Sequence, residues 1–239
     1  MATSRLPHHI SQQFDRELED IRSKVLTMGG LVEDHLQRVL DTLSKGDFEG
    51  AEYVAVNDFR VNALEVEIDS DCTDILLMRQ PAAGDLRLVL AVSKTITDLE
   101  RIGDEAEKIA RLVLNLNDTR PLNRYYVGMV RMGDHVRRMV YSALDAFARM
   151  DSEAAFKVAQ EDREIDGETD AIMRHLITFM MEDPRSISHV LDAALTVRSL
   201  ERIGDHAMNI CENVIYLVEG KDVRHVALEQ VQQELSSRK

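Results

Sequence analysis

Cysteine is nearly absent from this chain of 239 residues, which holds only Cys72 and Cys211. Two cysteines can build neither a disulfide framework nor a thiolate metal cage, so small secreted scaffolds and zinc modules are excluded. Tryptophan is missing, aromatic residues make up 5%, and there are only 4 prolines and 11 glycines. A β-sandwich or barrel of this length would need more aromatic residues and more Gly/Pro turns. The composition therefore favours an all-α protein.

Long apolar runs are also missing. No run approaches the ~18 residues of a transmembrane helix, and the first residues lack the apolar centre of a signal peptide. Acidic residues outnumber basic ones by 43 to 29, which gives a net charge of −14. Such a surface repels nucleic acid and anionic lipid. We therefore expect a cytoplasmic protein that binds no nucleic acid.

The chain contains the same unit twice. Residues 99–104, Leu-Glu-Arg-Ile-Gly-Asp, recur letter for letter as residues 200–205. Further upstream, residues 28–29 match residues 132–133, and Leu40 matches Leu144. Six identical residues in a row are very unlikely to arise by chance, so we interpret the pattern as an internal duplication.

Gly, Pro and N-cap residues divide each copy into three long segments. The predicted helices span residues 10–45, 48–79, 82–115, 124–150, 152–182 and 185–219. Helices of about 30 residues are ~45 Å long, and with short connections they pack as antiparallel bundles. The predicted fold is all-α, with two tandem three-helix bundles. The predicted domains are residues 1–117 and 121–220, followed by a polar tail over 221–239.

Acidic residues interrupt the apolar seam of the second helix in each copy. Asp58 and Asp162 occupy equivalent places in stripes that step by three and four residues. Burying a lone acid costs several kcal/mol of stability unless the acid pairs with a cation or coordinates a metal. Two such acids at matching positions of the repeats therefore indicate a retained feature. Asn62 and Asp166 follow one turn later. Glu65 adds an acid in the first copy only, so we expect the cluster of the second copy to hold fewer acidic residues.

The third helix of each copy carries an acid pair at i,i+4 spacing, which places both carboxylates on one face. The pairs are Glu100 with Asp104 and Glu201 with Asp205. Oxygen-rich clusters from facing helices suit Mg, Mn, Ca or Fe. We therefore predict a metal site between the second and third helices of each copy, with Mg, Mn, Fe or Zn as candidate ions.

Two alternatives remain open at this point. Arg101 and Arg202 could balance the charge of the acids in an ordinary salt-bridged seam without metal. A di-iron type of enzyme is the other alternative, but no His follows the acids at the carboxylate-x-x-His spacing of such proteins. No nucleophile, base and oxyanion donors come together in the sequence, so we expect no enzyme.

The turn between the predicted helices 124–150 and 152–182 carries Phe147, Arg149 and Met150. These residue types are enriched in protein interfaces, whereas the matching turn of the first copy is polar. We predict that these three residues bind a partner. The alternative is that Phe147 and Met150 cap the core of the bundle, and for Phe147 taken alone this alternative is favoured.

Several motifs together resemble the PhoU family of bacterial phosphate-uptake regulators, over nearly the whole chain. The duplicated Leu-Glu-Arg-Ile-Gly-Asp lies on the third helix of each unit. The other motifs follow in family order: residues 9–14, 28–30, 79–81, 85–88, 144–151, 180–183 and 222–225.

The resemblance implies a non-enzymatic negative regulator of phosphate uptake and of the phosphate-starvation response. Its implied partners are the ATPase of the phosphate ABC transporter, a sensor histidine kinase and its response regulator, with membrane contact only through them. A homodimer is also expected. Some family members hold metal clusters on the acid pairs, which implies metal ligands at Glu100, Asp104, Glu201 and Asp205, joined by the acids of the adjacent helix.

Overall fold

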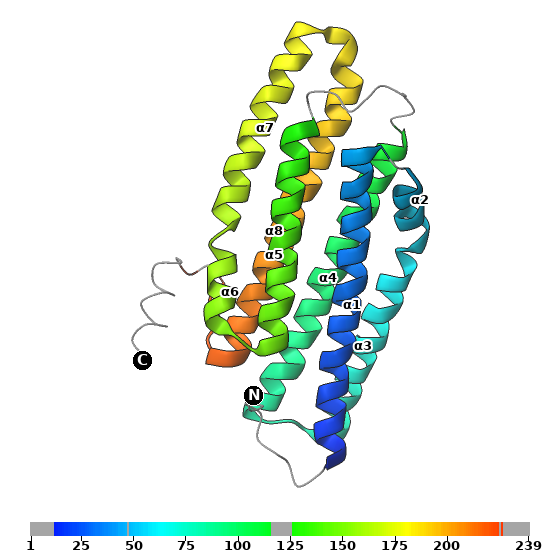
Figure 1. Cartoon of the computed structure of the whole chain (residues 1–239). Coiled ribbons are helices and arrows are strands. Elements are labelled where there is room, and N and C mark those ends of the chain that lie inside the picture. Colours follow the sequence, from blue (N-terminus) through cyan, green and yellow to red (C-terminus); the bar gives the residue numbers. More distant parts are fainter. Residues whose placement is uncertain (1–11, 47, 116–125, 225, 227–239) are drawn as a thin grey trace.

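The computed structural model describes residues 12–46, 48–115, 126–224 and 226 (Figure 1). These residues form helices, with no strand among them. The first repeat holds α1 (Gln12–Lys45), α2 (Phe48–Asn57), α3 (Phe59–Arg79) and α4 (Ala83–Asn115). The second holds α5 (Tyr126–Arg149), α6 (Ser152–Ala159), α7 (Asp162–Glu182), the short 3-10 helix η1 (Pro184–Ser186) and α8 (Ile187–Glu219). The predicted all-α duplicated fold is confirmed.

The middle helix of each repeat is broken, and the prediction of two continuous helices there is wrong. The break falls at Asp58 in the first repeat and just before Asp162 in the second. At these points N–H groups bond to carbonyls three residues back, from Val61 to Asp58 at 2.8 Å and from Glu161 to Val158 at 3.0 Å. Such bonds tighten and bend a helix. Neither break carries a glycine or proline that would have marked it in the sequence.

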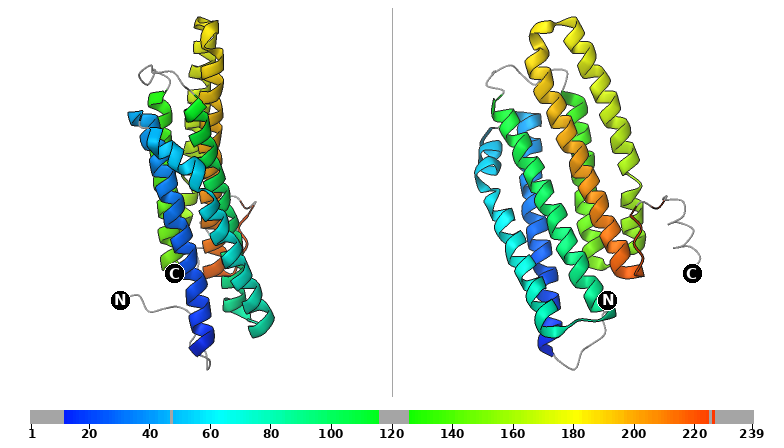
Figure 2. Two further views of the ribbon diagram at one scale, coloured as in Figure 1. Left: turned by 90° about the vertical axis from the view of Figure 1, so that its right-hand side faces the viewer. Right: turned by 180° about the vertical axis from the view of Figure 1, so that it is seen from behind.

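Four helices form the centre of the molecule (Figures 1 and 2). α1 packs on α4 and α5, and α8 packs on the same two helices. The broken pair α2 and α3 covers α1 and α4, whereas α6 and α7 cover α5 and α8. Each repeat is thus a three-helix bundle, and the two bundles meet along four helices rather than end to end.

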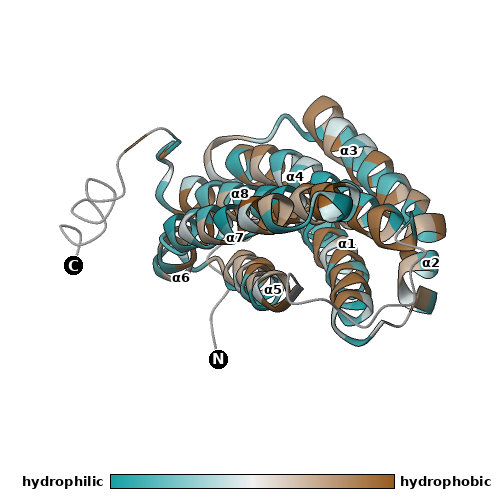
Figure 3. Cartoon of the chain, turned by 90° about the horizontal axis from the view of Figure 1, so that it is seen from above, coloured by the Kyte–Doolittle hydropathy of each residue, from teal (hydrophilic) through white to brown (hydrophobic). Residues whose placement is uncertain are grey.

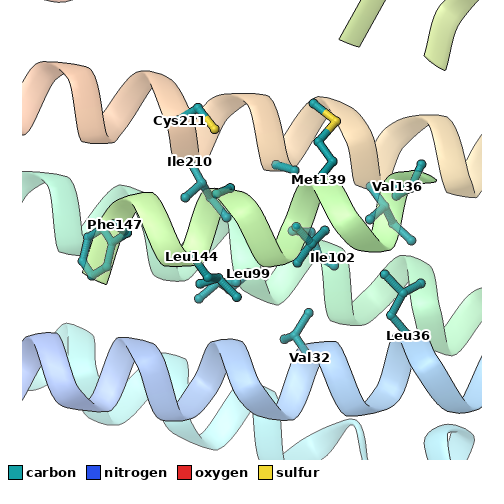
Figure 4. Close-up of a cluster of buried hydrophobic side chains, with 14 of the residues drawn as sticks. Val32, Leu36, Leu99, Ile102, Val136, Met139, Leu144, Phe147, Ile210 and Cys211 are labelled. Atoms are coloured by element: carbon teal, nitrogen blue, oxygen red, sulfur yellow. The ribbon is translucent and has the colours of Figure 1, made fainter. Parts of the chain in front are cut away.

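One apolar core runs through both repeats. Figure 4 shows Leu36 of α1, Leu99 and Ile102 of α4, and Ile210 of α8 in the same cluster, and all four are fully buried. Burying a side chain of this kind contributes roughly 1.5–3 kcal/mol. The core therefore crosses the predicted boundary between the repeats. Residues 118–120, at that boundary, lie outside the described residues.

Two repeat-matched glycines let α1 and α5 approach closely. A Cβ added to Gly29 would lie 2.7 Å from Cδ2 of Leu144, and one added to Gly133 would lie closer still to Cδ2 of Leu40. Both partners of each contact are matched residues of the duplication. The match between the copies therefore reflects a reciprocal contact, in which a leucine of each repeat fills the space above a glycine of the other.

Polar contacts join the repeats where α4 meets α8. The carboxylate of Asp98 accepts hydrogen bonds from Nδ2 of Asn209 at 3.1 Å and of Asn213 at 3.4 Å, and its Oδ1 lies 3.0 Å from Nδ1 of His206. Asp98 is buried, so these partners satisfy a group that would otherwise be costly. Among the described residues, none of the helices is long and apolar enough to cross a bilayer.

Candidate functional site

The helix break brings Asp58 against α4 in the first repeat. Its side chain is buried with 6% exposure, and Oδ1 has no hydrogen-bond partner. The absent side chain of Gly103 leaves room for this oxygen, since a Cβ there would lie 3.1 Å from it. Nδ2 of Asn62 donates a hydrogen bond to the other oxygen at 3.2 Å. One buried carboxylate oxygen is therefore left open toward the face between α3 and α4.

The predicted acids of the first repeat lie close enough to raise one another's pKa values by electrostatic repulsion. Burial, followed by the charges of Glu107 and Asp104, raises the pKa of Asp58 to about 6. Burial also raises the pKa of Glu100, and the negative charges of Asp104, Glu65 and Asp58 raise it further. The pKa of Glu65 and that of Asp104 are raised in the same way. Glu107 belongs to this group and was missed, although it stands one turn after Asp104 on the same helix.

The second repeat repeats the arrangement around Asp162. Its Oδ1 has no hydrogen-bond partner, and burial raises its pKa to about 6, with Asp205, Asp166 and Glu201 adding to the effect. Burial and the charge of Glu201 raise the pKa of Asp205. Asp166 stands at the position of the amide in the first repeat, so it repels its neighbour instead of donating to it.

The two arginines predicted to balance the charge of the acids do so without forming ion pairs with them. The charge of Arg202 opposes the rise in pKa of Asp205 and of Asp104. Its ion pair is with Glu105 of the first repeat, at 2.6 Å, and links the repeats. The cation that contacts Glu201 is Arg198, also at 2.6 Å, one turn earlier on α8. Arg101 is exposed and forms no ion pair within the described residues. Its positive charge opposes the rise in pKa of Glu65 and Glu100. The sequence did not reveal that Arg202 would cross between repeats, because that depends on how α4 and α8 meet.

The acids are gathered without forming a closed metal site. Within the part of the chain that the structure describes, no three His, Cys, Asp or Glu side chains converge closely enough to hold an ion. The residue types nevertheless fit a hard cation. Each repeat offers one buried carboxylate oxygen that has no hydrogen-bond partner, surrounded by carboxylates that repel one another. Side-chain rotation of the exposed Asp104 and Asp166 would be needed to complete either site.

The predicted partner-binding turn after α5 is only partly accessible. Phe147 is 1% exposed and belongs to the core, so its interpretation as a docking residue is wrong (Figure 4). The chain turns back at Met150, whose φ of 51° is left-handed, and Met150 packs partly against the same core. Arg149 is exposed and pairs with Asp145 on its own helix. Its role toward a partner stays a prediction.

Comparison with known proteins agrees with the duplicated architecture. The chain matches the PhoU domain over residues 25–113 and again over 129–214. It is 50% identical over 232 residues to a phosphate-specific transport system accessory protein PhoU homolog of Pseudomonas aeruginosa, covering 97% of this chain and 96% of that protein. It is 46% identical over 228 residues to the Escherichia coli phosphate-specific transport system accessory protein PhoU, covering 95% and 93% of the two chains.

Solved structures give the same result. The crystal structure of PhoU from Pseudomonas aeruginosa has 50% sequence identity and a TM-score of 0.84, covering 87% of this chain and 100% of that chain. The phosphate transport system regulatory protein PhoU from Streptococcus pneumoniae has 31% identity and a TM-score of 0.81, with coverage of 88% and 99%. The chain therefore belongs to the PhoU family.

Proposed function

We propose that this protein is a non-catalytic accessory protein of a phosphate-specific transport system, acting in the cytoplasm as a negative regulator of phosphate uptake. The observation that carries the proposal is the whole-length match: relatives named for that system align with 95–97% of this chain. Both repeats and their acid clusters lie within the matched region. In the proposed function the protein links the transporter ATPase to a sensor histidine kinase and its response regulator.

A metal ion is proposed to set the conformation of this adaptor. In the first repeat Asp58, Glu65, Glu100 and Asp104 would hold it, with the amide oxygen of Asn62 as a further donor. In the second repeat Asp162, Asp166, Glu201 and Asp205 would do so. A bound cation would supply positive charge, relieving the repulsion that raises the pKa values of these acids. It would also tie the break in the middle helix to the third helix of the same repeat.

A reporter experiment tests the regulatory role. The gene is deleted, and a phosphate-starvation promoter is followed in phosphate-rich medium, with the intact chain returned as the control. We expect the promoter to be active without the protein and silent when it is restored. A promoter that stays silent in the deletion strain, while it still responds to phosphate starvation, would contradict negative regulation.

A further inference from the structure

A groove on the surface runs between the first turns of α1 and the last turns of α3. It has a volume of about 390 Å³, and its lining residues recur on each helix at steps of three and four, which places them on one face. No residue of the described second repeat lines it. Figure 3 shows α3 at the outer edge of the molecule, with α1 and α4 between it and the second repeat. The fold thus leaves this groove uncovered.

The groove has an apolar floor and an acidic rim. Ile21 and Ile75 form the floor, with 1% and 4% exposure, whereas Met78 is 78% exposed. Asp20 and Asp74 are exposed acids of the same lining. Methionine is a flexible side chain that is common at surfaces which bind helices. The groove thus combines an apolar contact with negative charge, as an amphipathic ligand requires.

Negative charge is in excess in the groove. Four carboxylates and one guanidinium line it. The guanidinium of Arg79 donates two hydrogen bonds to Glu17, at 2.6 and 2.8 Å, and thereby lowers the pKa of that acid. Lys24, next to the groove, lies 2.6 Å from Asp71. Asp74 has no ion-pair partner within the described residues, so a ligand that fills the groove must bring positive charge.

The second repeat shows that the fold does not require these groups. The duplication places polar residues of α7 at three matching positions: His175 for Asp71, Thr178 for Asp74 and Glu182 for Met78. The three α7 residues are exposed, and α7 packs on α5 and α8 as α3 packs on α1 and α4. The stretch that matches the α1 side of the groove, residues 117–125, lies outside the described residues. The acids and the methionine of the groove are therefore available for binding rather than needed for folding.

We infer that this groove binds a cationic amphipathic helix of a partner protein. Charge complementarity selects this occupant, because lysine or arginine side chains of the helix would pair with Asp20 and Asp74. Its apolar side chains would contact Met78 and the two isoleucines of the floor. The insertion of an amphipathic helix into a groove is a recurring mode of recognition. The inference is independent of the regulatory function, since the partner is defined by its chemistry alone.

The size of the groove suits about two turns of helix. Its α1 side runs from Gln13 to Ile21, a distance of about 12 Å at 1.5 Å per residue. Two turns present apolar residues at positions i, i+4 and i+7, with cationic residues on either side. Because no α4 residue lines the groove, the bound helix would pack along α1 and α3 on the side away from α4. It would thereby complete a bundle of four helices in the first repeat.

A synthetic peptide tests the groove. The probe is a fluorescein-labelled peptide of about 14 residues, or four helical turns, with leucine on one helical face and lysine on the other. Fluorescence anisotropy follows its binding to the full chain at physiological salt. We expect saturable binding of one peptide per chain, about tenfold tighter than that of a scrambled peptide of the same composition. No binding, or equal binding of the two peptides through net charge alone, would overturn the inference.

Substitutions borrowed from α7 locate the binding site. Met78→Glu should weaken peptide binding by about tenfold, although it adds negative charge, because the apolar contact is lost. Asp74→Thr should weaken it by about threefold, since one exposed ion pair is removed. Glu52→Gln, which removes the charge of an exposed acid on α2, is the matched control and should bind as the intact chain does. Circular dichroism should show unchanged helix in all three variants.

Two results of this series would contradict the assignment. One is binding by Met78→Glu that equals or exceeds that of the intact chain, which would leave only attraction by charge. The other is a change in the oligomeric state of Met78→Glu, measured by sedimentation, together with unchanged peptide binding. That result would assign the groove to a contact between copies of this chain. All these measurements use the purified chain, so their failure leaves standing the regulatory proposal, which the reporter experiment tests.

Discussion

The carboxylate of Asp58 lies against Gly103, at a distance that leaves little room for a Cβ atom. A Cβ at Gly103 would lie 3.1 Å from Oδ1 of Asp58 and 3.2 Å from Cγ1 of Val61. The repeat-matched Gly204 differs, because its Cβ would meet Cγ2 of Ile165 at 3.4 Å, an ordinary contact. The glycine of the duplicated motif is therefore more tightly packed in the first repeat than in the second.

Alanine at the two glycines should therefore have different effects. In a helix interior alanine is favoured over glycine by about 1 kcal/mol. We expect Gly204→Ala to leave the free energy of unfolding unchanged or to raise it by up to about that amount. Gly103→Ala should lower the free energy of unfolding by about 1 kcal/mol or more, because Asp58 and Val61 must shift. Urea unfolding compares the two, and equal stabilisation by both would contradict the steric argument.

The raised pKa values predict a pH dependence of the metal-free protein. Asp58 and Asp162 titrate near 6 when folded, against 3.8 as their ordinary value. Between these values the folded state binds more protons than the unfolded state, so stability falls as the pH rises. We expect the contribution of both groups to be largest below pH 3.8 and lost by about pH 6.

The double variant Asp58→Asn/Asp162→Asn is the control for that measurement. It should show a shallower fall in the free energy of unfolding across this range in the presence of chelator, because the two titrating groups are gone. A pH profile identical to that of the intact chain would mean that these carboxylates are not the groups responsible.

Metal addition tests the acid clusters directly. An ion that binds only the folded state stabilises it by about 2.7 kcal/mol at a hundredfold excess over its Kd. Mn²⁺ should raise the melting temperature of the intact chain, and chelator should reverse the change. Asp58→Asn/Asp162→Asn should lose most of the shift. If Mn²⁺ and Mg²⁺ leave the melting temperature of the intact chain unchanged, the clusters are metal-free.

Arg149 has a natural control in its repeat counterpart, Lys45. Both are exposed, and both pair with an aspartate four residues earlier, Asp145 and Asp41. Arg149→Glu and Lys45→Glu should each change stability by no more than about 0.5 kcal/mol. Only Arg149→Glu is expected to weaken binding to the sensor kinase, measured by pull-down with its cytoplasmic part. Equal binding by both variants would remove the turn from the docking surface.

The sequence was informative where periodicity and duplication determine structure. Matched acids in two apolar seams predicted that Asp58 would face the third helix, and the structure brings it against Gly103. Contacts between repeats could not be predicted in this way. The ion pair of Arg202 with Glu105 depends on how two distant helices cross, which no local pattern encodes. Phe147 was included among the docking residues because the sequence favoured a turn there, whereas α5 continues to Arg149 and carries Phe147 on its buried face, in line with Val140 and Ala143.

We propose that this chain acts by binding components of the phosphate transport system rather than by catalysis. The deciding measurement is co-purification of the affinity-tagged intact chain from cells grown at high and at low phosphate. We expect the transporter ATPase and the sensor kinase to be recovered together with the protein at high phosphate, and in altered amounts at low phosphate. Failure to recover either partner under both conditions, with a folded and functional tagged protein, would contradict this mode of action.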